Sequence, residues 1–329
     1  MSKPLPHQII MKAGLVAEQR VRLFNCAYNL ECLEMLFLDL PPIFTFSDLP
    51  RRRPCPDDLW RAQDEAKWQD LRESGHLDDC APHPGSFVHK ITVLNNYIEE
   101  RVFLDQIRSS RLFRHSIASE QPRFIQAWIA SRPTVLQSVA DSDMSTTEAS
   151  CKDSVVHVVA ILHHIPLKTV YASLGWQVSE SSMRLAREMF KTFLEQKGEA
   201  SRKCLWHAVG IYAMLRGVQH LACYDTLSFC VAINYIWAYD CMAVPAAHGE
   251  IIRLDRQRPK VDVWVRNGGP LRLHITGVGI LNGHESRTRL MADAIKMMRS
   301  QIAWRNISHG LAAGFEQTLR GVRPTLVSE

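Results

Sequence analysis

The chain of 329 residues has few glycines, 16, and no excess of proline, also 16, so the two residue types that interrupt regular structure are not abundant. With few residues that break helices and strands, long regular elements can continue without interruption. Apolar types make up 46% of the sequence and charged types 22%, as in ordinary globular proteins. This composition excludes a disordered, collagen-like or low-complexity protein, and the chain is long enough to bury a sizeable core.

Long hydrophobic runs and a secretion signal are also missing. The most apolar stretch, 226–239, is too short for a bilayer, which needs about 20 apolar residues, and it contains Asn234. The first 14 residues lack the apolar region and the small-residue cleavage site of a signal peptide. The nine cysteines are odd in number, and most lie in apolar helical patterns. We therefore expect a soluble intracellular protein in a reducing compartment, with no membrane partner and a buried helix over 226–239.

An excess of charge of one sign is nearly absent, with 39 Lys and Arg against 34 Asp and Glu, a net charge of +5. That balance is too mild to mark a nucleic-acid-binding surface by itself. The one basic cluster, three arginines at 51–53, is shorter than the usual nuclear-import or nucleic-acid patch. A solvated loop is the favoured interpretation of this cluster, with nuclear import as the alternative.

Motifs that carry chemistry are missing as well. The sequence has no CxxC pair and none of the GxSxG, HExxH or GxxxxGK[ST] patterns, and the glycines at 277–283 follow GxGxxxG rather than dinucleotide spacing. Cys204 and His207 lie one helical turn apart, but two further zinc ligands are lacking. His157 and His164 lie two turns apart, too far to share an ion without a partner. We predict no catalytic, cofactor-binding or metal-ligating residues and no cofactor.

Helical periodicity dominates the rest of the sequence. Apolar residues recur at steps of three and four over 87–107, and similar spacing predicts helices over 17–38, 179–196, 202–217 and 224–242. The sequence predicts an all-α fold of about ten helices. Only 251–280, with alternating valines, could hold a loop, a short helix or a small hairpin. The expected core contains Phe24, Leu30, Ile91, Leu94, Ile98, Phe190, Phe229 and Trp237.

A family resemblance begins in residues 18–68. An arginine-rich amphipathic helix ends at Leu-Asp (38–39), and Pro-Pro-Ile-Phe (41–44), Pro-Cys-Pro (54–56), Asp-Asp-Leu-Trp (57–60) and Trp68 follow. This order resembles the fungal-specific transcription factor domain, the middle homology regulatory region, of the branch found with two-Cys, two-His zinc fingers. Later segments agree in order, namely 163–167, Leu-Gly-Trp-Gln-Val (174–178), 208–216, 253–256, 264–268, Gly-Val-Gly (277–279) and Trp304.

The resemblance implies a nuclear transcription regulator that controls a fungal secondary-metabolite gene cluster. Residues 1–329 would be the C-terminal portion of its regulatory domain, with two helical subregions, 1–140 and 151–329, joined by a polar loop. The zinc fingers and the upstream part of the domain are not in this sequence, so DNA would be reached only indirectly or through a missing N-terminal region. Any small-molecule effector is unknown.

The sequence also leaves an alternative function open and predicts an uncovered surface. The alternative function is a finger-less relative that has become an enzyme or a ligand-binding protein on the same scaffold, with His157, His164 and a carboxylate meeting in a pocket. Because the domain would start partway through its helices, we also expect an uncovered apolar face near Val21, Tyr28 and Cys32. A homodimer or a co-regulator protein is the expected partner.

Overall fold

The computed structural model describes residues 6–40, 43–44, 54–62, 64–73, 86–109, 153–246, 248–256 and 258–324. Two compact units, Met1–Ser138 and Val139–Glu329, make up the chain. The expected polar loop at 141–150 and the arginines at 51–53 lie outside the described residues. Twelve helices and three short strands are described, which confirms the all-α class.

The first unit contains α1 (Pro6–Leu38), α2 (Asp57–Trp60), α3 (Glu65–Glu73) and α4 (Phe87–Ser109). Helix α1 packs along α4, and α2 contacts α3. Asp39, the first residue after α1, has a left-handed φ of 59° and donates its backbone N–H to the Met35 carbonyl at 3.2 Å. Aspartate tolerates this backbone region better than most residues, so it suits the position after a helix.

The prediction of the core residues of this unit is partly wrong. Ile91, Leu94 and Ile98 of α4 are buried as predicted, but Phe24 and Leu30 of α1 are 53% and 50% exposed. Apolar residues occupy two sides of α1, and local spacing does not decide which side meets α4.

The face of α1 that is buried carries Val21, Asn25, Tyr28 and Cys32, at steps of three and four. The uncovered apolar face expected on this helix does not contain Val21, Tyr28 and Cys32, because these three side chains form its buried side. The apolar residues that the helix exposes lie on another side, at Leu23, Phe24 and Leu30.

The second unit is organised around α12 (Cys223–Met242). This helix contacts six others, α8 (Ser154–Leu162), α9 (Leu167–Ser173), α10 (Glu180–Gln196), α11 (Gly198–Leu215), α14 (His284–Arg299) and α15 (Arg305–Leu319). Phe190 and Phe229 are fully buried, as predicted, whereas Trp237 is only half-buried. A helix that is apolar on nearly every side belongs inside a bundle, as expected for 226–239.

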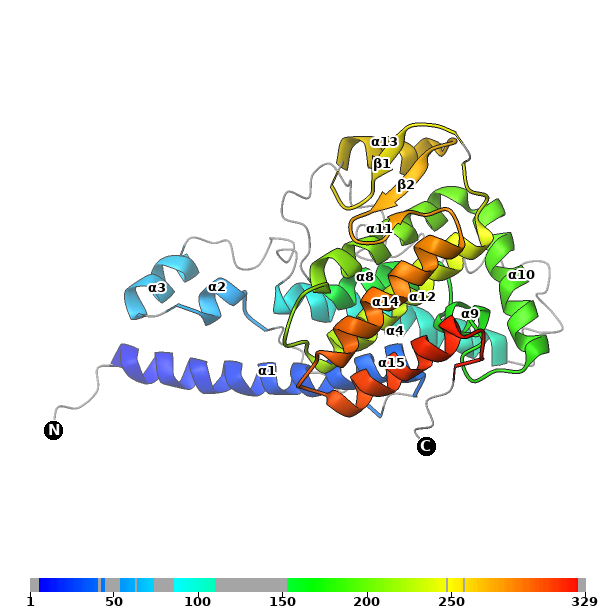
Figure 1. The fold of residues 1–329 in the computed structure, drawn as a ribbon. Coiled ribbons are helices and arrows are strands. Elements are labelled where there is room, and N and C mark those ends of the chain that lie inside the picture. The colour runs from blue at the N-terminus through cyan, green and yellow to red at the C-terminus, as the bar shows by residue number, and fades with distance from the viewer. Residues whose placement is uncertain are drawn as a thin grey trace. The chain divides into compact units, whose positions relative to one another are not determined.

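A small mixed sheet occupies the stretch 251–280. Strand β1 (Ile251–Arg253) pairs in parallel with β2 (Arg272–Ile275), and β2 pairs antiparallel with β3 (Gly279–Ile280). Helix α13 (Arg258–Asn267) joins β1 to β2, and these elements lie together at one end of the unit (Figure 1). Val261 and Val265 are buried in α13 while Val263 is exposed, so the alternating valines belong to a helix.

No single helix of the described residues is both long and apolar enough to cross a membrane. Only α8 and α9, taken together across a bend of 87°, reach the required length and composition.

Trp176 links two helices of the second unit. Its indole Nε1–H donates to Asn234 Oδ1 of α12 at 3.0 Å, and its ring meets the Phe315 ring of α15 edge-on, with centroids 5.7 Å apart. The six-membered part of the indole lies against Gly314 so closely that an added Cβ would overlap it. The absence of a side chain at Gly314 therefore allows α15 to approach Trp176.

We expect Gly314→Ala to lower the free energy of unfolding by about 1–3 kcal/mol, because the methyl group would displace the Trp176 ring in a packed core. Gly310→Ala, on the same helix, is the matched control, since a Cβ there meets nothing within 4 Å. The control should stabilise the helix by about 0.5–1 kcal/mol. Urea unfolding followed by circular dichroism measures both, and equal effects of the two substitutions would contradict this account.

Candidate functional site

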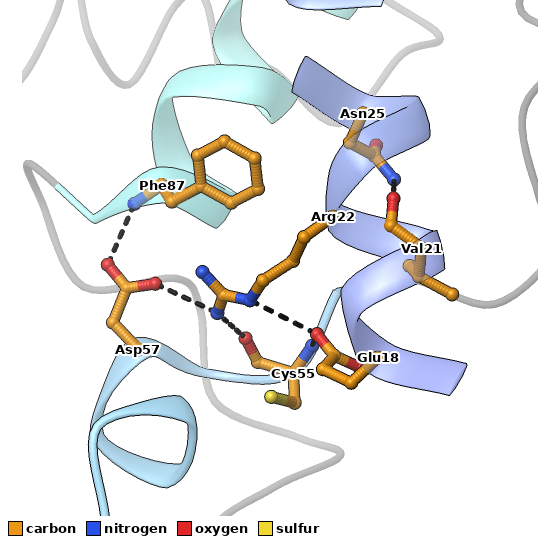
Figure 2. A network of polar contacts seen from close by, with 7 residues as sticks. All are labelled: Glu18, Val21, Arg22, Asn25, Cys55, Asp57 and Phe87. Atoms are coloured by element: carbon orange, nitrogen blue, oxygen red, sulfur yellow. Dashed lines mark hydrogen bonds and ion pairs between the residues drawn. The ribbon is translucent and has the colours of Figure 1, made fainter. Parts of the chain in front are cut away.

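Arg22 of α1 lies at the centre of a polar network of residues from α1, from the segment 55–60 and from the start of α4 (Figure 2). Its Nε donates to Glu18 Oε1 at 3.2 Å, and its Nη2 donates to the Cys55 carbonyl at 2.8 Å and to Asp57 Oδ1 at 3.1 Å. The guanidinium carbon lies 4.7 Å from the centroid of the Trp60 ring and 5.1 Å from that of Phe87. A single cation thus joins two carboxylates, one carbonyl and two aromatic faces.

The two carboxylates extend the network to the backbone. Glu18 Oε1 also accepts the Cys55 N–H at 2.8 Å, and Asp57 Oδ2 accepts the Phe87 N–H at 3.0 Å. Phe87 is the first residue of α4, so Asp57 places a negative charge where the N-terminus of that helix favours one. The network therefore ties α1, the segment before α2 and the start of α4 into one structure.

The Pro-Cys-Pro motif has a specific function in this network. Proline has no backbone N–H, so Cys55 supplies the one donor of residues 54–56, and Glu18 accepts it. The carbonyl of the same residue accepts from Arg22. Pro54 is buried, and its fixed backbone angle helps to hold Cys55 at the helix.

Glu18 and Arg22 were not among the functional residues predicted from the sequence. A signal was present, because these two charged residues are four apart and share the helix face of Val21 and Asn25, which is buried. Charged side chains on a buried face are rarely tolerated without partners.

The thiol of Cys55 is not an activated nucleophile. Burial is the main cause that raises its pKa to about 11, and Glu18 adds to the effect. A thiol with so high a pKa is protonated at neutral pH, whereas nucleophilic cysteines are thiolates. The arrangement around Arg22 supplies binding and positioning between segments of the chain rather than bond-making chemistry.

In the sequence, His157 was considered together with His164, whereas the structure pairs His157 with His207. His157 of α8 meets His207 of α11, with 2.9 Å between the two Nδ1 atoms and 5.2 Å between the ring centroids. His164 lies edge-on against His163, with centroids 5.0 Å apart. Cys204 does not turn toward His207, because its Sγ lies 3.8 Å from the Ile161 carbonyl.

The contact between His157 and His207 requires one Nδ1 to donate and the other to accept, so it suits two neutral rings. Burial holds the pKa of His207 well below its usual range, and the neighbouring His157 and His164 act in the same direction. Over the described ranges, no group of three or more His, Cys, Asp or Glu could hold a metal ion.

The Gly-Val-Gly segment at 277–279 begins against the side chain of Arg216. Arg216 Nη1 donates to the Thr276 carbonyl at 2.9 Å, and Arg216 Nε lies 2.8 Å from Asp293 Oδ2. Tyr212 donates its hydroxyl to the same carboxylate at 2.5 Å. Gly277 has a φ of +91°, and a Cβ there would overlap the guanidinium group, so the turn requires glycine.

Comparison with known proteins gives one relative. A protein of Gibberella fujikuroi (strain CBS 195.34 / IMI 58289 / NRRL A-6831) named "Transcription factor" is 22% identical to this chain over 297 residues. The match takes in 89% of this chain and 39% of that protein, so the chain spans about two fifths of its relative's length. No family model and no solved structure matches. The chain is thus related to a fungal protein that is named as a transcription factor.

We expect Arg22→Ala to lower the free energy of unfolding by about 3 kcal/mol, because it leaves the carboxylates of Glu18 and Asp57 without their shared cation. Arg61→Ala is the control, since Arg61 is exposed at the end of α2 and should change stability by about 0.5 kcal/mol at most. Denaturant unfolding measures both variants. An Arg22 variant as stable as the unmodified chain would show that the network contributes little.

The buried histidine pair predicts a loss of stability in acid. The folded chain keeps His207 neutral, whereas the unfolded chain protonates it below its ordinary pKa of 6.5. The unfolded state therefore binds more protons as the pH falls below that value, and the free energy of unfolding decreases by at most about 1.4 kcal/mol per pH unit.

Thermal unfolding between neutral pH and pH about 5 tests this expectation. His207→Asn should flatten the pH dependence, because it removes the buried titrating ring while keeping a polar group near His157. His220→Gln, which changes an exposed histidine, should leave the slope as it was. Parallel slopes for all three proteins would contradict the assignment.

Proposed function

We propose that this chain is the regulatory module of a transcription regulator, built on a helical scaffold of the fungal-specific transcription factor type. The observation that carries the proposal is the match of 89% of the chain to a protein named as a transcription factor. A match of that extent supports relationship along the scaffold as a whole rather than at one short motif.

The network around Arg22 supports the same proposal. Residues of the Pro-Cys-Pro and Asp-Asp-Leu-Trp motifs are engaged in holding α1, α2 and α4 together, as residues of a scaffold would be. In the second unit, Trp176 and Arg216 perform a comparable role between helices and a turn. These residues of the motifs thus act through packing and hydrogen bonding within the chain.

The buried thiols agree with a scaffold rather than a catalyst. Burial is the largest cause that raises the pKa of Cys32, Cys204 and Cys230 to about 12 in each case. These cysteines are neutral at physiological pH and fill space as small hydrophobic groups.

The finer parts of the proposal come from the family resemblance. We infer a nuclear protein that reaches DNA indirectly or through a further region, and that controls genes of fungal secondary metabolism. The net charge of +5 is consistent with weak, sequence-independent contact with DNA by this chain. Its partner would be a second copy or a co-regulator protein.

A reporter assay tests the proposal. With the full chain fused to a heterologous DNA-binding domain, we expect reporter transcription to change several-fold relative to the DNA-binding domain alone. Arg22→Ala should abolish the change by loosening the scaffold, whereas the exposed Arg61→Ala should preserve it. A fusion that is expressed, folded and nuclear but leaves the reporter unchanged would contradict a regulatory function.

A further inference from the structure

Helix α1 has a second apolar side, opposite to the one that packs on α4. We call this side the outer face of α1. Leu23 is 70% exposed, and the other members of the face are also exposed. The outer face consists of Val16, Leu23, Phe24, Ala27, Leu30 and Leu38. Large apolar side chains gathered on one helix face are a usual mark of an interaction surface.

The spacing of the outer face is that of a helix-pairing surface. Val16, Leu23 and Leu30 are seven residues apart, and Ala27 lies four residues after Leu23. This repeat keeps the side chains on one stripe along the helix, as in helices that pair side by side. From Val16 to Leu38 the stripe is about 33 Å long, given a rise of about 1.5 Å per residue.

Two charges within the stripe, on either side of Ala27, specify a direction. Arg20 precedes Ala27 by seven residues and Glu34 follows it by seven, and both side chains are exposed. Neither makes an ion pair with another described residue. In an antiparallel pair centred on Ala27, Arg20 lies opposite Glu34 of the partner subunit, and the same contact occurs a second time by symmetry. A parallel pair would instead oppose like charges.

Four of the apolar residues follow the same symmetry. Val16 and Leu38 are equally distant from Ala27, as are Phe24 and Leu30, so antiparallel pairing places these four side chains against apolar groups. Leu23 lies opposite Glu31 of the partner subunit. Ala27 itself lies on the two-fold axis, where a small side chain allows two helices to approach to about 8–10 Å.

We propose that a second copy of this chain docks on the outer face of α1, forming an antiparallel, two-fold-symmetric helix pair centred on Ala27. The proposal goes beyond the regulatory function above and rests only on the pattern of exposed residues on α1. A failed reporter assay would therefore leave it standing, and a monomeric chain would leave the regulatory proposal standing.

Sedimentation velocity of the full chain over a micromolar concentration series is the first test, and we expect a reversible dimer. Arg20→Glu and Glu34→Arg should each weaken the dimer about tenfold, because each turns two attractive contacts into repulsive ones. The double variant Arg20→Glu with Glu34→Arg should return affinity to that of the unmodified chain. Only an antiparallel arrangement predicts this rescue, since a parallel pair opposes like charges in all four proteins.

Apolar variants supply the second test. The double variant Leu23→Glu with Leu30→Glu should abolish the dimer, with unchanged circular dichroism because both side chains are exposed. Leu185→Glu is the matched control, since Leu185 is 64% exposed on α10, and it should leave the dimer intact. A chain that stays monomeric, a dimer that survives the double leucine variant, or charge reversals without rescue would each overturn the proposal.

Discussion

The first unit depends on how one cation is compensated. Arg22 is only 12% exposed at its side chain, and removing a guanidinium group from water is costly unless its donors find acceptors. Glu18, Asp57 and the Cys55 carbonyl provide those acceptors from two separate segments of the chain. The same groups are costly to bury without Arg22, so the parts of the network stabilise one another.

This dependence explains how α2 can exist. A helix of four residues has no stability of its own in water, because nucleating a helix is unfavourable and needs many bonds to offset it. Asp57 at its first position and Trp60 at its last both contact Arg22, one through a carboxylate and one through an aromatic face. Tertiary contacts therefore hold α2 in place, as Asp57 also does for the start of α4.

Local spacing in the sequence was sufficient for the helices but not for their partners. The steps of three and four that define α4 placed Ile91, Leu94 and Ile98 correctly in the core. On α1 the same spacing predicted that Phe24 and Leu30 are buried, but both are exposed. The prediction failed because α1 has two apolar sides, and the spacing of both is that of a helix. The choice between them depends on α4 and on the Arg22 network, which involve residues about 35–75 positions away in the sequence.

The histidines show the same limit in the second unit. In the sequence, His157 was considered as a partner of His164, and Cys204 as a partner of His207, because each pair is close along the chain. The contact that forms instead joins His157 to His207, which are 50 residues apart. The valines at 261, 263 and 265 alternate as in a strand, yet they lie on α13, where only the first and third face inward. Contacts between distant segments decide both outcomes.

Several residues that carry the family resemblance are buried or bonded within the chain, and this affects where recognition of a partner can lie. Trp176, Arg22 and Gly277 each pack against or hydrogen-bond to other parts of the chain, so these residues serve its scaffold. A scaffold alone does not define what a protein recognises, because function depends on the surfaces and sites that the scaffold displays. Residues that bind a partner have to be reachable from outside, and α1 displays its second apolar stripe there. The inner side of α1 thus serves the fold, while the outer face is the surface on which we propose that a second copy docks.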